Sequence, residues 1–422
     1  MIYDVVIFGG GTAGVSAAYT SAKLGLNTLL VEAGDVPGGA ITQGLVVPVM
    51  KLDSLGINTD FYNDLVDKAQ SYNAQNTYKD GNTGWFNPEL LKIVFDNMLK
   101  SVNCNVLFST TPISANKNTI LEKYHVQLKH KILSLDIETK YIVDTTANGE
   151  IFRILNYEFQ KNENQSQAAS LRFNISGIDM NAFASWLEEI DSDTNVTTVD
   201  RSKSQIHLST ACTWDKSRNW ALLPIFEKAV QDEVLNESDC AYFQVFTIPD
   251  MIGTLAVNAP RIILKENESI LEPFTYSNAL TQGRERIYRL HKFCKKYLNG
   301  FENSFISHIS DTLGVRESYR IKGKYTYTKN DIINHKKFEN VAFACDYPID
   351  IHSSQKTNDK LEKISEPYFI PIECLIAECD DNLYAAGRII SADFESQAAL
   401  RTQMSCFSMG EAVAKDIFKK IK

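Results

Sequence analysis

The sequence predicts an α/β protein, in which a discontinuous, doubly wound nucleotide-binding domain of the Rossmann type is interrupted by an inserted mixed α/β domain. Three observations predict this fold class. A glycine-rich turn between an apolar strand and a small-residue helix opens the chain, and a strand with a glycine turn before another small-residue helix closes it. Between them, the chain of 422 residues changes to long amphipathic stretches. We expect residues 1–150 and 351–422 to form the nucleotide-binding domain and residues 151–350 to form the insert.

The first βαβ unit lies at the N-terminus. Tyr3–Phe8 is an apolar, β-branched run typical of a buried parallel strand, and it leads into Gly9–Gly14, which fits G-x-G-x-x-G. Residues 13–24 have the small side chains of a closely packed helix, and a second strand, Thr28–Val31, ends in Glu32. A βαβ turn without a ligand is the alternative, but the order of strand, glycines, helix, strand and acid favours a dinucleotide site.

Each of these residues has a mechanical role in such a site. Gly9 permits the tight turn, Gly11 lets the backbone approach a pyrophosphate, and Gly14 lets the helix pack closely on the strand. The free N–H groups of the helix N-terminus attract the phosphates. Glu32 accepts hydrogen bonds from a ribose diol, which favours FAD or NAD over NADP. The predicted cofactor-binding residues of this unit are Gly9, Gly11, Thr12, Ala13, Gly14 and Glu32.

Further elements complete the two predicted domains. Asn87-Pro88-Glu89 is a helix start and predicts a helix to about residue 101, followed by a third parallel strand at Val106–Phe108. Residues 112–142 are typical of a β-meander that returns to the sheet. In the insert, Leu222–Leu235 and Ala279–Leu298 are amphipathic.

Several separated motifs then carry a resemblance to a known family. A second glycine-rich loop, Ala33–Gly44, follows the acid directly, where simple NAD domains rarely have one, and the closing strand and helix lie near the C-terminus. The chain resembles the FAD-dependent oxidoreductases with two dinucleotide-binding folds (glutathione reductase type), in the branch that includes the flavin subunit of heterodisulfide reductases. The motifs are Gly9–Gly14, Tyr141–Gly149, Leu313–Ile321, Tyr347–His352, Asn382–Arg388 and Arg401–Met409. One departure is Asp144-Thr145-Thr146-Ala147, where the family usually has Asp-Ala-Thr-Gly.

The resemblance implies FAD, which we assume to be bound without a covalent link, and further residues around it. The second loop would wrap the pyrophosphate and reach the flavin, and the closing element would bring the chain end beside the isoalloxazine. The residues implied are Ala33, Gly38, Gly39, Ala40, Thr42, Gly387, Arg388, Arg401, Thr402, Gln403 and Met404. The cysteine motifs that hold iron–sulfur clusters are missing, so we expect no cluster and no metal site.

Candidate catalytic residues lie in the later motifs. Asp350 and His352 fall on one side of an extended strand, so the acid can orient a histidine that acts as the base; an unremarkable surface histidine is the alternative. Arg316 and Arg320 are our candidates for holding an anionic or polyhydroxyl substrate. Three charges in five residues, counting Glu317, are equally typical of a solvated face or a structural ion pair. Arg261 and Tyr319 are weaker candidates.

Composition limits the class of partner and compartment. The net charge of −9 argues against a nucleic-acid partner, and no apolar run reaches the ~18 residues of a membrane span. Eight scattered cysteines and an N-terminus without a leader pattern suggest a cytoplasmic protein with free thiols.

We therefore expect an FAD-dependent dehydrogenase that transfers a hydride from a carbon of a small polar substrate to flavin N5, with an unknown external electron acceptor. Two alternatives remain open. The first is a flavin-dependent reductase of an activated double bond, and the second is an electron-carrying flavoprotein subunit of a complex.

Overall fold

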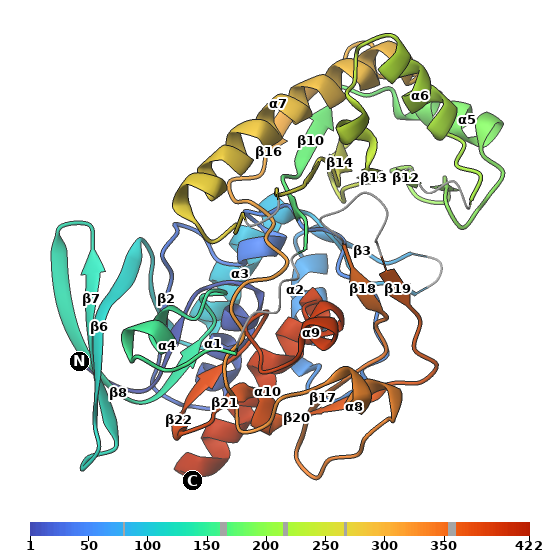
Figure 1. Cartoon of the computed structure of the whole chain (residues 1–422). Helices are drawn as coiled ribbons and strands as arrows, with labels where there is room; N and C mark the ends of the chain where they lie inside the picture. Colours follow the sequence, from blue (N-terminus) through green and yellow to red (C-terminus); the bar gives the residue numbers. More distant parts are fainter. Residues whose placement is uncertain (79–80, 161–166, 214–217, 266–267, 353–359) are drawn as a thin grey trace.

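A computed structural model of the chain describes residues 1–78, 81–160, 167–213, 218–265, 268–352 and 360–422 (Figure 1). Its largest sheet has a parallel centre, whose inner strands are buried over their carboxyl-terminal halves and whose edge strand at residues 105–107 is partly exposed. The parallel strands in spatial order are β22 (Asp380–Ala385), β8 (Leu133–Asp144), β1 (Ile2–Phe8), β2 (Thr28–Val31) and β5 (Asn105–Leu107). The short β21 (Ile376–Ala377) joins the edge antiparallel to β22.

Strand β8 belongs to two structures at once. Its first half pairs antiparallel with β7 (Lys123–His130), which pairs with β6 (Thr110–Asn118), and its second half pairs parallel with β1. This meander extends away from the helices at the side of the molecule (Figure 1). Its inner side chains form a separate core against the sheet, from Val6 and Phe8 to Tyr124 and Val126.

Four helices cover the other face of the parallel strands: α1 (Thr12–Lys23), α2 (Asp60–Gln70), α3 (Pro88–Ser101) and α10 (Gln403–Ile421). The first and the last helix touch at backbone distance. A Cβ on Gly410 would lie 2.2 Å from the carbonyl oxygen of Ala13, and Ser16 Oγ donates to the carbonyl of Phe407 at 2.6 Å. Glycine is therefore required where the C-terminal helix crosses the N-terminal one.

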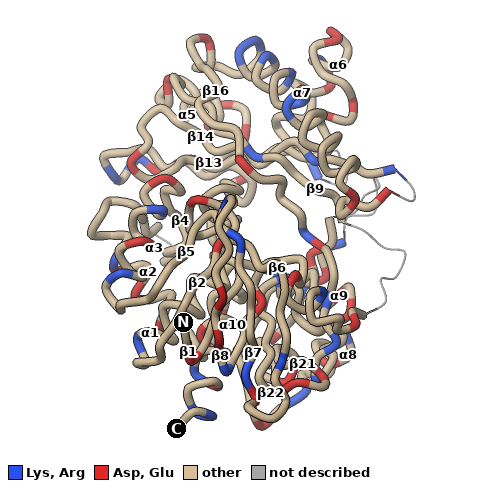
Figure 2. Tube along the Cα trace, turned by 90° about the vertical axis from the view of Figure 1, so that its left-hand side faces the viewer, with Lys and Arg blue, Asp and Glu red and all other residues tan. Residues whose placement is uncertain are grey.

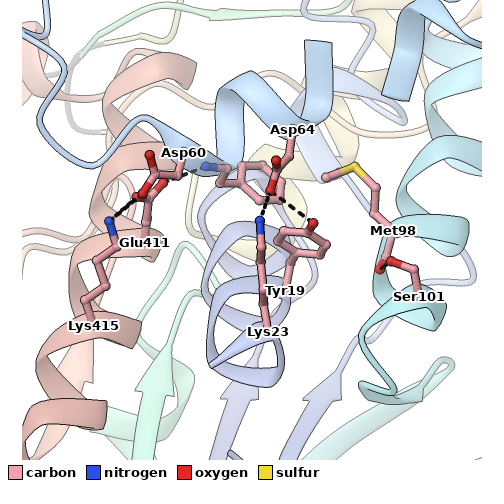
Figure 3. Close-up of polar contacts among 9 residues, drawn as sticks. Tyr19, Lys23, Asp60, Asp64, Met98, Ser101, Glu411 and Lys415 are labelled. Atoms are coloured by element: carbon pink, nitrogen blue, oxygen red, sulfur yellow. Dashed lines mark hydrogen bonds and ion pairs between the residues drawn. The ribbon is translucent and has the colours of Figure 1, made fainter. Parts of the chain in front are cut away.

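Polar contacts fasten α2 to its neighbours (Figure 3). Thr59, which precedes α2, makes no side-chain cap, but buried Glu411 of α10 accepts a hydrogen bond from the Phe61 N–H at 2.7 Å. A carboxylate from another helix thus satisfies a free amide at the helix start and favours its positive end. Lys415 bridges Glu411 and Asp60 at 2.7 Å and 2.9 Å. On the other side, Asp64 accepts hydrogen bonds from Tyr19 and Lys23 of α1.

The inserted part has its own sheet and core. Its antiparallel sheet has the order β11 (Thr198–Asp200), β12 (His207–Thr213), β13 (Tyr242–Thr247), β14 (Leu255–Val257), β10 (Phe173–Ser176) and β16 (Phe305–Ile309). One face packs on α5 (Met180–Ile190), α6 (Leu223–Gln231) and α7 (Pro273–Tyr297). Because side chains alternate along a strand, Phe173 and Ile175 enter this core while Arg172 and Asn174 face the other way, toward the nucleotide-binding part.

Further short elements complete the two parts and the connections between them. They are β3 (Gln75–Asn76), β4 (Trp85–Phe86), α4 (Glu150–Ile154), β9 (Ala169–Ser170), β15 (Arg261–Ile262), α8 (Lys329–Ile333), β17 (Val341–Cys345), β18 (Ile349–Ile351), β19 (Lys360–Glu362), β20 (Tyr368–Pro371), α9 (Phe394–Leu400) and the 3-10 turns Gly39–Ile41, Glu237–Cys240 and Ile372–Leu375. Among them, β9 pairs with β15 and β18 with β19.

The predicted elements of the nucleotide-binding part are confirmed within one or two residues, including the helix start at Asn87, whose side chain accepts from the Glu89 and Leu90 amides. The packing gives the insert narrower limits than 151–350. Its core draws on residues between Ala169 and Leu313, whereas residues from Tyr327 to Ile349 pack in the core of the nucleotide-binding part. We propose the same two-part division with these narrower limits.

The surface carries both signs of charge. Lys and Arg are interspersed with Asp and Glu over both parts of the molecule (Figure 2). In the described ranges, no helix combines the length and the apolar character that crossing a membrane requires.

Candidate active site

A cavity of about 910 Å³ lies where the antiparallel sheet of the inserted part, which we call the cap, faces the carboxyl ends of β1, β2 and β8. This size is in the range of small-molecule and cofactor sites, and the carboxyl edge of a parallel sheet is where such folds bind ligands. One wall is formed by the glycine turn after β1, and the opposite wall by Arg172, which immediately precedes β10, and by side chains of β13.

Two glycines of the first turn are needed by the protein itself. Gly9 has φ +97°, and a Cβ there would lie 2.6 Å from the carbonyl oxygen of Thr145. A Cβ on Gly14 would lie 1.8 Å from the carbonyl oxygen of Gly9. These positions bring the turn against the end of β8 and the helix against the turn, as the motif predicts.

Gly11 is different, because a Cβ there would meet nothing within 4 Å. Its φ of −70° and ψ of −172° suit any residue, so neither strain nor packing within the protein requires glycine. The second loop lies beside it: Gly38 forms a bridge with Gly11 and donates to the carbonyl of Gly10 at 2.7 Å. The open space above Gly11 is what a pyrophosphate held at the start of α1 requires, so the residues fit a dinucleotide cofactor.

Glu32 stands at the end of β2 with its carboxylate turned back to the turn. Its oxygens accept from the Gly10 amide at 2.5 Å and from the Gly34 amide at 2.6 Å. Each oxygen keeps a further acceptor position, and the residue lines the cavity. It therefore ties the two glycine loops together and remains able to accept from a ribose.

The loop after β8 is held by an arginine. Arg388 donates to the carbonyls of Ala147 and Val315 at 2.9 Å and 2.7 Å and to Asn148 Oδ1 at 2.8 Å. Burial lowers the pKa of Arg388 to about 10. Ala147, which replaces the usual glycine, has φ +68°, a region that disfavours residues with a Cβ. Arg388 therefore stabilises a loop whose backbone is strained at Ala147.

The closing element reaches the cavity at the start of α10. Thr402 precedes the helix, and Gln403 donates through its side chain to the carbonyl of Val46 while its Oε1 lies 3.4 Å from Thr12 Oγ1. The two ends of the chain thus meet at the cofactor wall.

The structure brings most of the predicted cofactor residues to the cavity but not all. Those that line it are Gly9, Gly11, Thr12, Ala13, Glu32, Ala33, Gly39, Ala40, Gly387, Arg388, Arg401, Thr402 and Gln403. Gly14, Gly38, Thr42 and Met404 lie behind this wall, where they support it: Thr42 Oγ1 donates to the carbonyl of Pro37 at 2.7 Å, and Met404 is part of the main core.

Three arginines form a cationic part of the far wall: Arg172, Arg316 and Arg401. Burial lowers the pKa of Arg172 to about 10. Burial and, after it, the positive charges of the neighbouring arginines, including Arg261, together lower the pKa of Arg316 to about 9. Burial also lowers the pKa of Arg401. The site thus brings positive charges together in a desolvated place, where an anion would relieve the repulsion.

The hydrogen bonds of these arginines do not use all of their N–H groups. Arg316 donates to the carbonyl of Ala168 at 2.5 Å, and Arg401 to Gln167 Oε1 and the carbonyl of Asp350, both at 3.1 Å. The Nε atoms of Arg172 and Arg401 are buried and have no partner among the described residues.

Asp350 and His352 meet as the strand pattern predicts. His352 Nε2 lies 3.0 Å from Asp350 Oδ2, both line the cavity, and their side chains are 21% and 19% exposed. Burial would raise the pKa of Asp350, but its hydrogen bond with His352 and the charges of Arg401 and Arg316 outweigh burial and bring it to about 2. Burial and then Arg316 lower the pKa of His352 to about 4. The pair is therefore a carboxylate and a neutral imidazole at neutral pH.

Arg320 lies elsewhere. It is 2% exposed, is not among the residues that line the cavity, and forms an ion pair with Glu317 at 3.1 Å. Burial raises the pKa of Glu317 to about 7. Arg320 therefore forms the structural ion pair that the sequence analysis left open as an alternative to substrate binding. Tyr319 also lies outside the cavity lining, and its ring packs against that of Phe159 with the centroids 5.1 Å apart.

Sequence reasoning missed several residues of the far wall. Arg172 was detectable as a lone charge in the apolar run Leu171–Ile175. On β13, Tyr242, Gln244 and Phe246 alternate onto the cavity face, and the Tyr242 hydroxyl donates to Gln244 Oε1 at 3.0 Å. The alternation of these residue types fits a strand face that is exposed to solvent as well as one that faces a ligand. Only the packing of the cap shows which of these two faces it is.

Comparison with known proteins gives the following likenesses. A stretch of 45 residues, 11% of this chain, is 47% identical to Protein FixC of Azotobacter vinelandii, and the chain spans only a tenth of the length of that relative. Two solved structures cover this whole chain: a geranylgeranyl bacteriochlorophyll reductase-like protein of Thermoplasma acidophilum (12% identity, 79% of that chain, TM-score 0.46) and a flavoprotein/dehydrogenase of Cytophaga hutchinsonii (11% identity, 79% of that chain, TM-score 0.47). These scores are too low to support an argument about function.

The family match is far more extensive. Residues 4–415 match the model of the family described as FAD dependent oxidoreductase, from the first strand to the last helix. The glycine cradle, the cavity and the meeting of both chain ends fit the cofactor of that family. The chain belongs to the family of FAD-dependent oxidoreductases.

Proposed function

We propose that the protein transfers a hydride between FAD and a carbon of a small anionic substrate, and that oxidation of the substrate is the forward direction. The observation that carries this proposal is the continuity of the cavity. One cavity joins the glycine cradle at Gly11 to the arginines and to the Asp350–His352 pair. A substrate held by the arginines would share this space with the cofactor.

The arginines favour an anion over a neutral polyhydroxyl compound. Arg316 and Arg401 line the same wall, and Asp350 is the carboxylate that opposes them. A guanidinium has donors only, and its bond to a carboxylate is about twice as strong as a neutral hydrogen bond. In our proposal Arg316, Arg401 and Arg172 anchor the substrate, whereas Arg320 stabilises the segment that carries Arg316 through its ion pair with Glu317.

FAD accepts a hydride at N5, so the protein has to orient the substrate, exclude water and take up a proton. We assign the proton to His352, which is neutral at pH 7 and lies on the cavity wall. Asp350 orients the ring and stabilises it when protonated. Tyr242, Gln244 and Asn258 supply polar contacts for a hydroxyl or carbonyl group of the substrate.

We further propose that the FAD is bound without a covalent link and that no iron–sulfur cluster accompanies it. Cys406 is the cysteine that lines the cavity, and burial raises the pKa of its thiol to about 12, which disfavours the reactive thiolate. Denaturation with acid is expected to release all of the flavin. Flavin that stays with the precipitated chain, or stoichiometric iron, contradicts this part of the proposal.

The test is an anaerobic reduction experiment on the purified flavoprotein, followed by its visible spectrum. We expect pooled small hydroxycarboxylates to bleach the flavin bands and neutral polyols to leave them unchanged. Rapid bleaching by NAD(P)H with no response to any carboxylate would instead favour the reductase direction.

Two histidine variants test the assignment of the base. H352A is expected to keep FAD and to slow single-turnover reduction by about 10²–10⁴-fold, the usual contribution of a general base. H308A is the matched control, because His308 Nδ1 lies 3.2 Å from Glu89 Oε1 and His308 is not among the residues that line the cavity. Full single-turnover reduction in H352A refutes the assignment.

A further inference from the structure

The two ring nitrogens of His352 are both engaged in the structure. Nε2 lies 3.0 Å from Asp350 Oδ2, and Nδ1 lies 3.1 Å from Nη2 of Arg261. A guanidinium only donates and a carboxylate only accepts. Nδ1 must therefore be the acceptor and Nε2 the protonated nitrogen, so the two neighbours together select one tautomer of the neutral ring.

Arg261 is placed for this contact by its own surroundings. It lies on β15, where it pairs with Ser170 of β9, and its carbonyl accepts from Arg286 Nη1 at 2.8 Å. It is 7% exposed, and its guanidinium carbon lies 5.4 Å from the ring centre of Tyr242. A cation at this distance from an aromatic face is attracted by it. Backbone and side chain are thus both held beside His352.

We propose that Arg261 is a positioning residue, which holds His352 in the Nε2–H tautomer and, by donating to Nδ1, disfavours protonation of the ring. Asp350 alone would allow either a neutral or a charged imidazole, because it accepts from both. Arg261 separates the two states, since a protonated Nδ1 and an N–H of the guanidinium cannot face each other. Nδ1 is also the one nitrogen at which the neutral ring can take up a substrate proton, and it can do so only when the Arg261 N–H turns away from it.

Of the other charged or titratable groups around the ring, Asp350 also requires the proton of the neutral ring to lie on Nε2, because its carboxylate only accepts. Arg316 and Arg401 disfavour the charged ring, and Asp350 favours it. Tyr347 donates to Asp350 Oδ2 at 3.3 Å, and burial raises the pKa of this tyrosine, so it stays neutral. Among these neighbours, Arg261 is the one with a hydrogen bond to Nδ1.

Nitrogen-15 NMR of histidine-labelled, FAD-loaded protein tests the proposal without turnover, with His352 assigned through H352A. In the wild type we expect the Nε2–H tautomer and no protonation above about pH 5, given the pKa of about 4. In R261M we expect the neutral ring to keep the Nε2–H tautomer through Asp350 and its pKa to rise by about one to two units, because a hydrogen bond to the neutral ring and a nearby positive charge are both lost. R261K, which keeps a donor and a charge, should return part of the way to the wild type. R284M, which changes an exposed arginine of α7, serves as the control for a changed surface charge.

Two results would overturn the proposal: an Nδ1–H tautomer in the wild type, or an R261M titration that superimposes on that of the wild type. The first needs no variant, so it stands even if R261M folds poorly.

The consequence for catalysis rests on the proposed function and is measured separately. The acid limb of single-turnover flavin reduction should move to higher pH in R261M by the same amount as the NMR titration. If the NMR results hold and the acid limb stays in place, His352 is positioned by Arg261 but is not the base.

Discussion

The cofactor wall and the substrate wall of the same cavity are built in different ways. Most of the cofactor wall is backbone from the first 44 residues, namely the turn at Gly9–Gly14, Glu32 and the second loop beside Gly38, and the start of α10 completes it. The substrate wall consists of side chains from distant segments, among them Arg172, Arg316 and Arg401. The cofactor wall depends on the absence of a Cβ at its glycines, and the substrate wall depends on charges that the fold brings together. They should therefore fail in different ways when they are changed.

The largest effect is expected from Gly14→Ala, compared with Gly11→Ala. A Cβ at Gly14 would lie 1.8 Å from a carbonyl oxygen, whereas one at Gly11 meets nothing within 4 Å. Overpacking typically costs 1–3 kcal/mol and here should exceed this range, so we expect G14A to yield little folded protein. G11A should unfold within about 0.5 kcal/mol of the wild-type apoprotein and yet bind FAD at least about tenfold more weakly. Thermal unfolding of apoprotein and FAD titration measure both, and equal behaviour of the two variants would contradict the different roles of the two glycines.

Arg320→Met should act on stability and depend on pH. Removing one partner of a buried ion pair costs about 3–5 kcal/mol when the other stays charged. The pKa of Glu317 is raised from 4.5 to about 7, so its neutral form is favoured by the fold, and the stability it contributes is lost as pH rises from about 4.5 through 7. The loss in R320M should therefore approach that range at pH 8 and be much smaller at pH 6. Denaturant unfolding at both pH values checks this, and a loss independent of pH would argue against a charged Glu317 as its cause.

Arg316→Met should act on the substrate and leave FAD in place. Losing one charge-assisted hydrogen bond to an anion costs about 1.5–3 kcal/mol, which corresponds to a roughly tenfold to hundredfold rise in the substrate concentration needed for half-maximal flavin reduction. R320M is the comparison, because Arg320 is not among the cavity-lining residues, and it should retain wild-type substrate affinity at pH 6. The same affinity in R316M and the wild type would remove Arg316 from the anchoring role.

Ala147→Gly should have the smallest effect, and in the opposite direction. Ala147 has φ +68°, where a Cβ is disfavoured by about 1–2 kcal/mol, and part of that gain is offset by the greater freedom of glycine in the unfolded chain. We expect the apoprotein to be stabilised by about 0.5–1 kcal/mol in thermal unfolding. Destabilisation would mean that the contacts of the Ala147 methyl group stabilise the fold by more than its backbone strain destabilises it.

Predictions from the sequence were most accurate where the interacting residues are close in the chain and lie on regular secondary structure. The strand, the glycine turn, the helix and Glu32 interact within 32 residues, so their spacing already contains the geometry. Asp350 and His352 are likewise two residues apart on a strand, and their contact is confirmed at 3.0 Å. Arg316 and Arg320 are just as close in sequence, but their segment has no regular strand or helix to set the direction of each side chain. One therefore lines the cavity and the other pairs with Glu317.

The sequence by itself determined the fold class and the position of the dinucleotide cradle, because these depend on short-range backbone geometry and on residues that leave space. The choice of FAD over NAD came from the resemblance of several separated motifs to a known family. Only the tertiary structure decided which arginines face the cavity, where the cap core begins and that Arg261 contacts His352. Those facts depend on segments such as β10, β15 and α10 meeting across more than 90 residues of chain, as Arg261 and His352 do at 3.1 Å. No spacing in a single sequence records such a meeting, because it results from the packing of two cores against each other.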